Sequence, residues 1–190
     1  MKIAFCVTGS FCTLNKLEQP LLKLKEKGAY IQPVFSPSVY YTGTRFGTAE
    51  KWKELFEDIT GNKVWYTISE AEPIGPKNLF DVTIVAPCTG NTLTKLAQGI
   101  TDTAPSMAVK ATLRNQKPVV IAVSTNDGLS NCAKNIGQLL NQKNIYFVPF
   151  GQDDPIEKPT SLVAHFSYIP ETVDAALKGI QLQPLLLSEQ

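Results

Sequence analysis

An apolar run leads directly into a polar helix start in residues 82–99, VTIVAPCTGNTLTKLAQG. Residues 82–86 are almost entirely apolar, which is typical of a strand buried on both faces of a parallel sheet. Residues 91–98 follow as a predicted helix opened by polar residues. Between the two elements, three hydrogen-bonding side chains surround a glycine, more than a helix cap alone requires: Thr89, Asn91 and Thr92. The stretch therefore predicts a strand, a polar ligand-binding loop and a helix.

Two further apolar runs, residues 3–7 and 119–123, predict central parallel strands by the same reasoning. Residues 30–35 predict another strand, because they follow a helical stretch, residues 14–27, that ends at Gly28. The remaining predicted elements are helices over residues 49–60, 106–115, 131–142 and 171–179 and short strands over residues 63–66 and 146–149. Strands that alternate with helices favour an α/β fold with a doubly wound, Rossmann-like parallel sheet of about five to six strands flanked by helices.

The domain organisation follows from length and composition. We expect a single domain over residues 1–180 and a C-terminal tail over residues 181–190. Residues 151–159 have the composition of a loop, and at this length they predict a functional flap. The tail includes three leucines, residues 185–187, which a monomer has to bury and an oligomer can use as an arm.

Composition excludes several classes of protein. Hydrophobic residues make up 43% and charged residues 18% of the 190 residues, and the net charge is +1, so the basic excess typical of a nucleic-acid-binding protein is missing. Four scattered cysteines and one histidine give no zinc-binding pattern, so we expect no metal site. No stretch approaches the length of a membrane span, and residues 1–8 read as a first strand. We therefore expect a cytoplasmic protein with free thiols and no membrane partner.

Polar residues follow each predicted central strand. Because the carboxyl ends of parallel strands meet at one edge of the sheet, we expect these residues to converge on one ligand. Backbone amides and hydroxyls at helix starts favour a phosphate group there. The pattern G-x-G-x-x-G is absent, so NAD in its usual pose is not supported. Each loop alone is also explained by helix capping or a turn. The candidate ligand-binding residues are Gly9, Ser10, Ser36, Pro87, Thr89, Asn91, Thr92, Ser124, Thr125 and Asn126.

Residues 87–102, PCTGNTLTKLAQGITD, resemble the motif P-A-S-A-N-T-x-x-K-x-A-x-G-x-x-D of a flavoprotein family. That family comprises homo-oligomeric flavin-containing cysteine decarboxylases and flavin prenyltransferase-like proteins. The resemblance implies that FMN is the cofactor and that copies of the chain form a homo-oligomer. It also implies that five of the candidate residues line the flavin and its phosphate: Gly9, Ser10, Ser36, Thr89 and Thr92.

The chain also departs from the family pattern. Cysteine-decarboxylating members carry a histidine between the second and third strands, whereas the histidine of this chain is His165. Prenyltransferases carry an arginine where this chain has Ser124 and Thr125. Over its whole length, including residues 43–47 and 152–155, the chain is more similar to a branch of the family found in the mother cell of sporulating bacteria. That branch implies an oxidoreductase subunit acting on a small dicarboxylate, with a second subunit that carries its own nicotinamide (NAD(P)) site.

A dicarboxylate substrate requires cationic side chains near it. Arg45 and Lys158 are the candidates, because they lie in loops with glycine or proline; a solvated surface charge is the alternative for each. His165 is a candidate acid–base residue, although a histidine in an apolar run is also commonly structural.

Two other functions remain open: a non-catalytic flavin-fold partner that stabilises the second subunit, and a flavin-dependent decarboxylase of another substrate.

Overall fold

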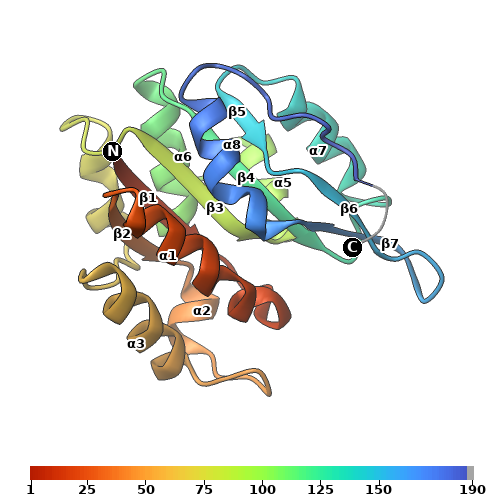
Figure 1. Ribbon diagram of the computed structural model, residues 1–190, viewed down its shortest axis with the longest axis horizontal. Helices are drawn as coiled ribbons and strands as arrows, with labels where there is room; N and C mark the ends of the chain where they lie inside the picture. Colours follow the sequence, from red (N-terminus) through yellow and green to blue (C-terminus); the bar gives the residue numbers. More distant parts are fainter. Residues whose placement is uncertain (188–190) are drawn as a thin grey trace.

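A mostly parallel sheet runs through the centre of the molecule (Figure 1). The computed structural model describes residues 1–187, and within them the sheet has seven strands in the order β2-β1-β3-β4-β7-β6, with β5 paired to β4. Strands β1 to β5 are parallel, whereas β7 runs antiparallel to both β4 and β6. The strands are β1 Lys2–Val7, β2 Tyr30–Phe35, β3 Val82–Cys88, β4 Val119–Thr125, β5 Ile145–Phe147, β6 Phe150–Asp154 and β7 Lys158–Ala164.

The parallel strands form the core. Every residue of β3 is buried, as are all residues of β1 except its first, because helices cover both faces of the sheet. The strand order reverses between β1 and β3, since β2 lies on one side of β1 and the later strands lie on the other. The predicted doubly wound α/β fold is confirmed, and the reversal identifies the edge at which ligands bind in such sheets.

The helices form two layers, one on each side of the sheet (Figure 1). On one side, α1 Glu18–Glu26 packs against α3 Ala49–Thr60 and α8 Ile169–Ala176. On the other side, α6 Ala104–Arg114 and α5 Gly90–Gln98 pack together, and α7 Ala133–Leu140 packs against α5. Shorter helical segments complete the chain: η1 Phe11–Leu17, α2 Pro37–Tyr41, α4 Ile68–Ala71, η2 Glu72–Ile74 and η3 Phe166–Tyr168.

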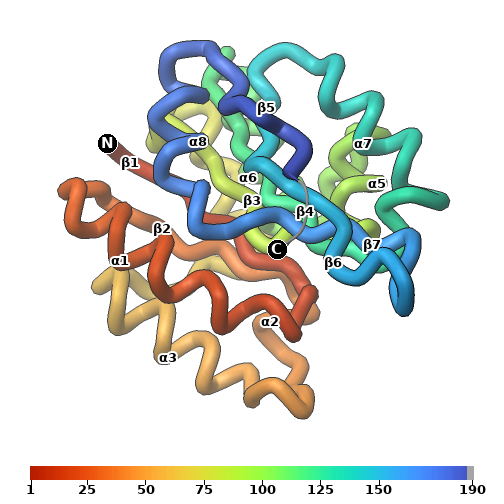
Figure 2. Tube along the Cα trace, turned by 45° about the vertical axis from the view of Figure 1, so that its right-hand side comes forward, coloured from red at the N-terminus to blue at the C-terminus, as the bar shows by residue number. Residues whose placement is uncertain are grey.

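Three local predictions differ from the structure in their bounds or in the type of element. The helix predicted over residues 14–27 begins earlier, as the 3-10 segment η1, before α1 continues it. The strand predicted over residues 63–66 is a single bridge between Val34 and Trp65. Residues 151–159 do not form a loop, because most of them belong to a hairpin of β6 and β7 that projects from one end of the sheet (Figure 2).

The segment after α8 returns to the sheet. The Gln181 side chain bonds to the backbone of Phe147 in β5, and Phe150 of β6 exchanges backbone hydrogen bonds of 3.0 Å with Leu185 and Leu187. Residues 185–187 therefore cover part of the edge of β6 (Figure 2). The last three residues of the predicted tail, 188–190, lie outside the described part of the chain.

Within residues 1–187, no helix combines the length and the apolar character that a membrane span requires. The four cysteines are free thiols, of which three are buried: Cys6, Cys88 and Cys132.

Candidate functional site

A cavity of about 850 Å³ opens at the carboxyl ends of β1, β3 and β4. This volume lies within the usual range for cofactor and small-molecule sites. It lies beside the reversal of strand order, where the fold predicts a ligand. Its neutral polar lining comes from three strand-end loops: Gly9, Ser10 and Thr13 after β1, Thr89, Gly90 and Asn91 after β3, and Ser124, Thr125 and Asn126 at the end of β4.

Hydrogen bonds of side-chain hydroxyl groups connect these loops. The Ser10 and Ser124 hydroxyls lie 2.7 Å apart and hydrogen-bond each other, which joins the first loop to the end of β4. Thr8 donates to the carbonyl oxygen of Pro87 at 2.7 Å and accepts from the backbone amide of Thr89 at 3.1 Å. Residues some 80 positions apart in sequence are thereby fixed at one rim, which holds the donors in place before a ligand binds.

The N-terminus of α5 faces the cavity. Thr89 caps this helix, because its hydroxyl accepts from the backbone amide of Thr92 at 3.3 Å. The other backbone amides of the first turn have no partner within the helix and carry its positive dipole end. Gly90 leaves room for a cluster behind this turn: a Cβ there would lie 2.7 Å from Thr125 Oγ1 and Asp127 Oδ1. Within the cluster, the Thr125 hydroxyl donates to the Asp127 carboxylate.

Three cations and two carboxylates also line the cavity: Lys16, Arg45, Lys158, Asp127 and Asp153. Lys158 lies 2.9 Å from Asp153 on the β6–β7 hairpin, and this hydrogen bond raises the pKa of Lys158. The Arg45 guanidinium lies 4.9 Å from the centre of the Phe46 ring, in a turn closed by backbone bonds between Thr44 and Gly47. The cations outnumber the carboxylates, so the cavity favours an anionic ligand.

The structure brings most of the candidate residues to this cavity. Nine of them line it: Gly9, Ser10, Arg45, Thr89, Asn91, Ser124, Thr125, Asn126 and Lys158. Ser36 does not, because it is buried and bonds to Ser38 at 2.9 Å, and Ser38 packs behind Gly9. Pro87 and Thr92 do not line the cavity either. The Thr8 hydroxyl donates to the carbonyl oxygen of Pro87, and the Thr89 hydroxyl donates to the hydroxyl of Thr92.

His165 does not line this cavity. Burial lowers the pKa of its imidazole, and the nearby positive charge of Lys16 lowers it further. Its Nε2 atom is buried and has no hydrogen-bond partner among the described residues. The imidazole therefore favours the neutral form.

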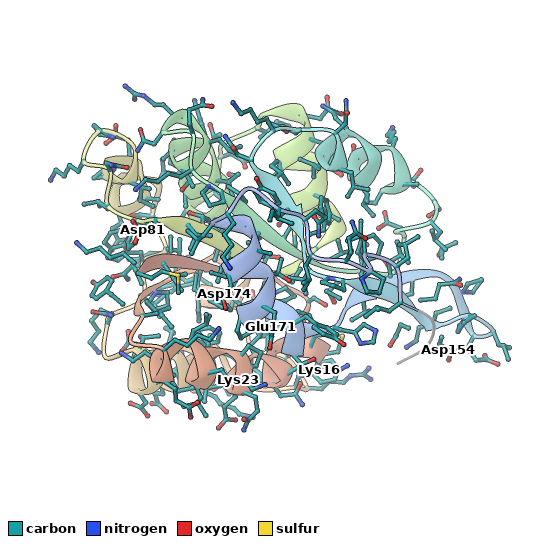
Figure 3. All side chains as sticks on the ribbon, turned by 45° about the horizontal axis from the view of Figure 1, so that its top comes forward. Lys16, Lys23, Asp81, Asp154, Glu171 and Asp174 are labelled. Atoms are coloured by element: carbon teal, nitrogen blue, oxygen red, sulfur yellow. The ribbon has the colours of Figure 1, made fainter. Side chains whose placement is uncertain are left out.

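Sequence reasoning missed three charged residues of the cavity, Lys16, Asp127 and Asp153. Lys16 lies on the helical segment η1, where a lysine is usually a surface residue in contact with solvent. In the view of Figure 3 it lies between Lys23 and the hairpin that carries Asp154. Asp127 directly follows the three polar residues predicted after β4, so extending that run by one residue finds it.

Comparisons with known proteins agree with this geometry. The family model named Flavoprotein matches residues 1–178. The chain is 45% identical to the B subunit of dipicolinate synthase from Bacillus subtilis (strain 168) over 186 residues, which is 98% of this chain and 93% of that protein.

Solved structures show the same similarity. A crystal structure of the dipicolinate synthase B subunit from Bacillus halodurans C matches with a TM-score of 0.92 and 43% identity, over 100% of this chain and 97% of that chain. The FMN-dependent cysteine decarboxylase SpaF shares the fold, with a TM-score of 0.68 and 18% identity over 94% and 97% of the two chains. With a family match over nearly its whole length and a polar cavity at the strand ends, this chain belongs to the Flavoprotein family.

Proposed function

We propose that this chain is the flavin-binding B subunit of a dipicolinate synthase. In the proposed reaction, a hydroxylated tetrahydrodipicolinate loses water and two hydrogens to give pyridine-2,6-dicarboxylate. The observation that carries the proposal is a single cavity lined both by neutral hydrogen-bond donors, which suit a phosphate group, and by the cations Lys16, Arg45 and Lys158. Support also comes from the 45% identical relative, whose name is that of a dipicolinate synthase B subunit.

The lining residues fit FMN. Its phosphate requires several neutral donors, and the cavity offers the Ser10 and Ser124 hydroxyls together with the first-turn amides of α5. Gly9 allows Ser38 to pack against the first loop, since a Cβ there would lie 2.9 Å from Ser38 Oγ. Thr125 and Asn126, at the end of β4, are the proposed contacts of the flavin ring. Bound FMN would supply an acceptor for the two hydrogens.

The charged rim would hold the substrate. Both cations predicted from the sequence, Arg45 and Lys158, line the cavity. Lys158 is paired with Asp153, so Arg45 is the proposed carboxylate ligand of the two. We leave His165 out of the proposed chemistry, since its side chain is not part of the cavity lining.

The proposal includes partners. The word "subunit" in the relatives' names implies a second polypeptide, for which we propose a subunit with its own NAD(P) site. We also propose that copies of this chain form a homo-oligomer and that the protein acts in the mother cell of a sporulating bacterium.

The test has two parts. In the first, the purified chain is examined for flavin absorbance, and added FMN is expected to raise its melting temperature. A chain with no flavin absorbance and no rise in melting temperature would remove the cofactor from the proposal.

In the second part, each subunit is assayed alone and together for the absorbance of pyridine-2,6-dicarboxylate, with FMN and NAD(P) added one at a time. Full activity of the second subunit alone would favour a non-catalytic partner. Release of carbon dioxide from a cysteinyl peptide would instead favour a decarboxylase.

A further inference from the structure

The cations of the cavity come from three separate segments: Lys16 lies on η1, Arg45 in the turn between α2 and α3, and Lys158 on the hairpin. Most of the neutral donors lie in the strand-end loops, although Thr13 shares η1 with Lys16 and Ser161 shares β7 with Lys158. The cavity therefore offers cations in addition to neutral donors. Neutral amides and hydroxyls suffice for a phosphate, so the cations are available for a second anion.

The three cations differ in their partners. Lys158 is paired with Asp153 at 2.9 Å, so its charge is already balanced. Neither Lys16 nor Arg45 has a carboxylate within ion-pair distance among the described residues. Both line the same cavity and both are solvent-exposed, so each keeps a charge that a ligand can use.

From this arrangement we infer that Lys16 and Arg45 bind the two carboxylates of the substrate and product, one each, and that Lys158 serves to hold the hairpin through Asp153. This inference rests on the proposed function and adds a residue, Lys16, to the site. The planar guanidinium of Arg45 matches a carboxylate in a two-point hydrogen bond, whereas the ammonium of Lys16 acts as a point charge.

Arg45 is partly positioned before the ligand arrives. Backbone hydrogen bonds of 2.9 and 3.1 Å close the turn from Thr44 to Gly47, and the guanidinium packs on the Phe46 ring. Lys16 is positioned by η1, whose buried residues Leu14 and Leu17 fix the segment against the core. Each cation thus projects from a structured segment of the chain.

The test compares two ligands that differ by one carboxylate, pyridine-2,6-dicarboxylate and pyridine-2-carboxylate, by calorimetry on the full chain. The wild-type chain is expected to bind the dicarboxylate more tightly. Lys16→Ala and Arg45→Ala are each expected to reduce that preference by about tenfold or more, which is the usual effect of losing one charged hydrogen bond. Arg45→Lys is expected to give an intermediate loss, because it keeps the charge but not the planar fork.

Lys134→Ala is the matched control, because Lys134 is an exposed lysine on α7 that does not line the cavity. It is expected to bind both ligands as the wild type does. Melting temperatures of all variants establish that they fold.

Two outcomes would overturn the inference: a wild-type chain without preference for the dicarboxylate, and variants that weaken FMN binding instead of dicarboxylate binding. FMN binding is measured separately by flavin absorbance. A chain that prefers the dicarboxylate but binds no FMN would refute the flavin part of the proposed function and leave this inference standing.

Discussion

Gly90 allows the N-terminus of α5 to approach the end of β4, and its replacement tests the construction of the site. In Gly90→Ala, the new Cβ would lie 2.7 Å from Thr125 Oγ1 and Asp127 Oδ1 and 2.8 Å from Cys132 Sγ. These atoms belong to short side chains, two of which are hydrogen-bonded to each other, so they have little freedom to move. The backbone of α5 would have to shift away from these side chains.

The expected size of the effect follows from two opposing contributions. Overpacking of this kind costs about 1–3 kcal/mol, and alanine recovers at most about 1 kcal/mol of helix propensity. We therefore expect the free energy of unfolding to fall by about 1–2 kcal/mol, which lowers the melting temperature of a chain of this size by roughly 2–8 °C. FMN affinity should fall as well, because the first-turn amides move.

The assay is thermal and urea unfolding of wild type and variant, with FMN titration of each. Gly137→Ala is the control, because Gly137 lies inside α7 and a Cβ added there would have nothing within 4 Å of it. That variant should match or slightly exceed the wild type in stability. A Gly90→Ala protein that melts at or above the wild-type temperature would refute the packing argument.

Three further predictions concern other parts of the molecule. Ser10→Ala should weaken FMN binding by about tenfold, because it removes the hydroxyl that bonds to Ser124 at 2.7 Å; unchanged affinity in a fluorescence titration would contradict this. The pKa of His165 is lowered in the folded protein, so the stability that its neutral form contributes is present above the ordinary value of 6.5 and is lost as the pH falls below it. Unfolding of His165→Gln should show less loss of stability at acidic pH, and an identical pH profile would argue against the effect. Gly151→Ala should detach the C-terminal segment, since its Cβ would lie 2.6 Å from the carbonyl oxygen of Leu187, and faster proteolysis of that segment would report it.

The central strands were predictable because a strand that is buried on both faces consists almost entirely of apolar residues. Residues 3–7, 82–86 and 119–123 are apolar runs, and all lie in buried parallel strands. The hairpin of β6 and β7 was not predictable in the same way. Its residues include Gly151, Asp153 and Asp154, which are typical of loops, and their pairing with β7 depends on contacts with the rest of the sheet.

The candidate site was predictable where it depends on topology. Strand ends meet at one edge in any parallel sheet, so the residues after β1, β3 and β4 were expected together. Side-chain direction was not predictable: Ser36 also follows a strand, yet it turns toward Ser38 and away from the cavity. Lys16 was missed because an exposed lysine on a helical segment gives no sequence signal that separates a binding residue from a solvated one.

Among residues 1–187, β4 is the one strand of the parallel sheet that pairs with the β6–β7 hairpin, through Ser124 with Val163 and Thr125 with Leu162. These two β4 residues also line the cavity. A ligand that binds in the cavity would restrain these two residues and, through them, the strand β7 that pairs with them. Amide hydrogen exchange along β7 would therefore slow even at positions that no ligand touches. Hydrogen exchange in the hairpin would therefore report whether a ligand occupies the cavity, without a label or a chromophore.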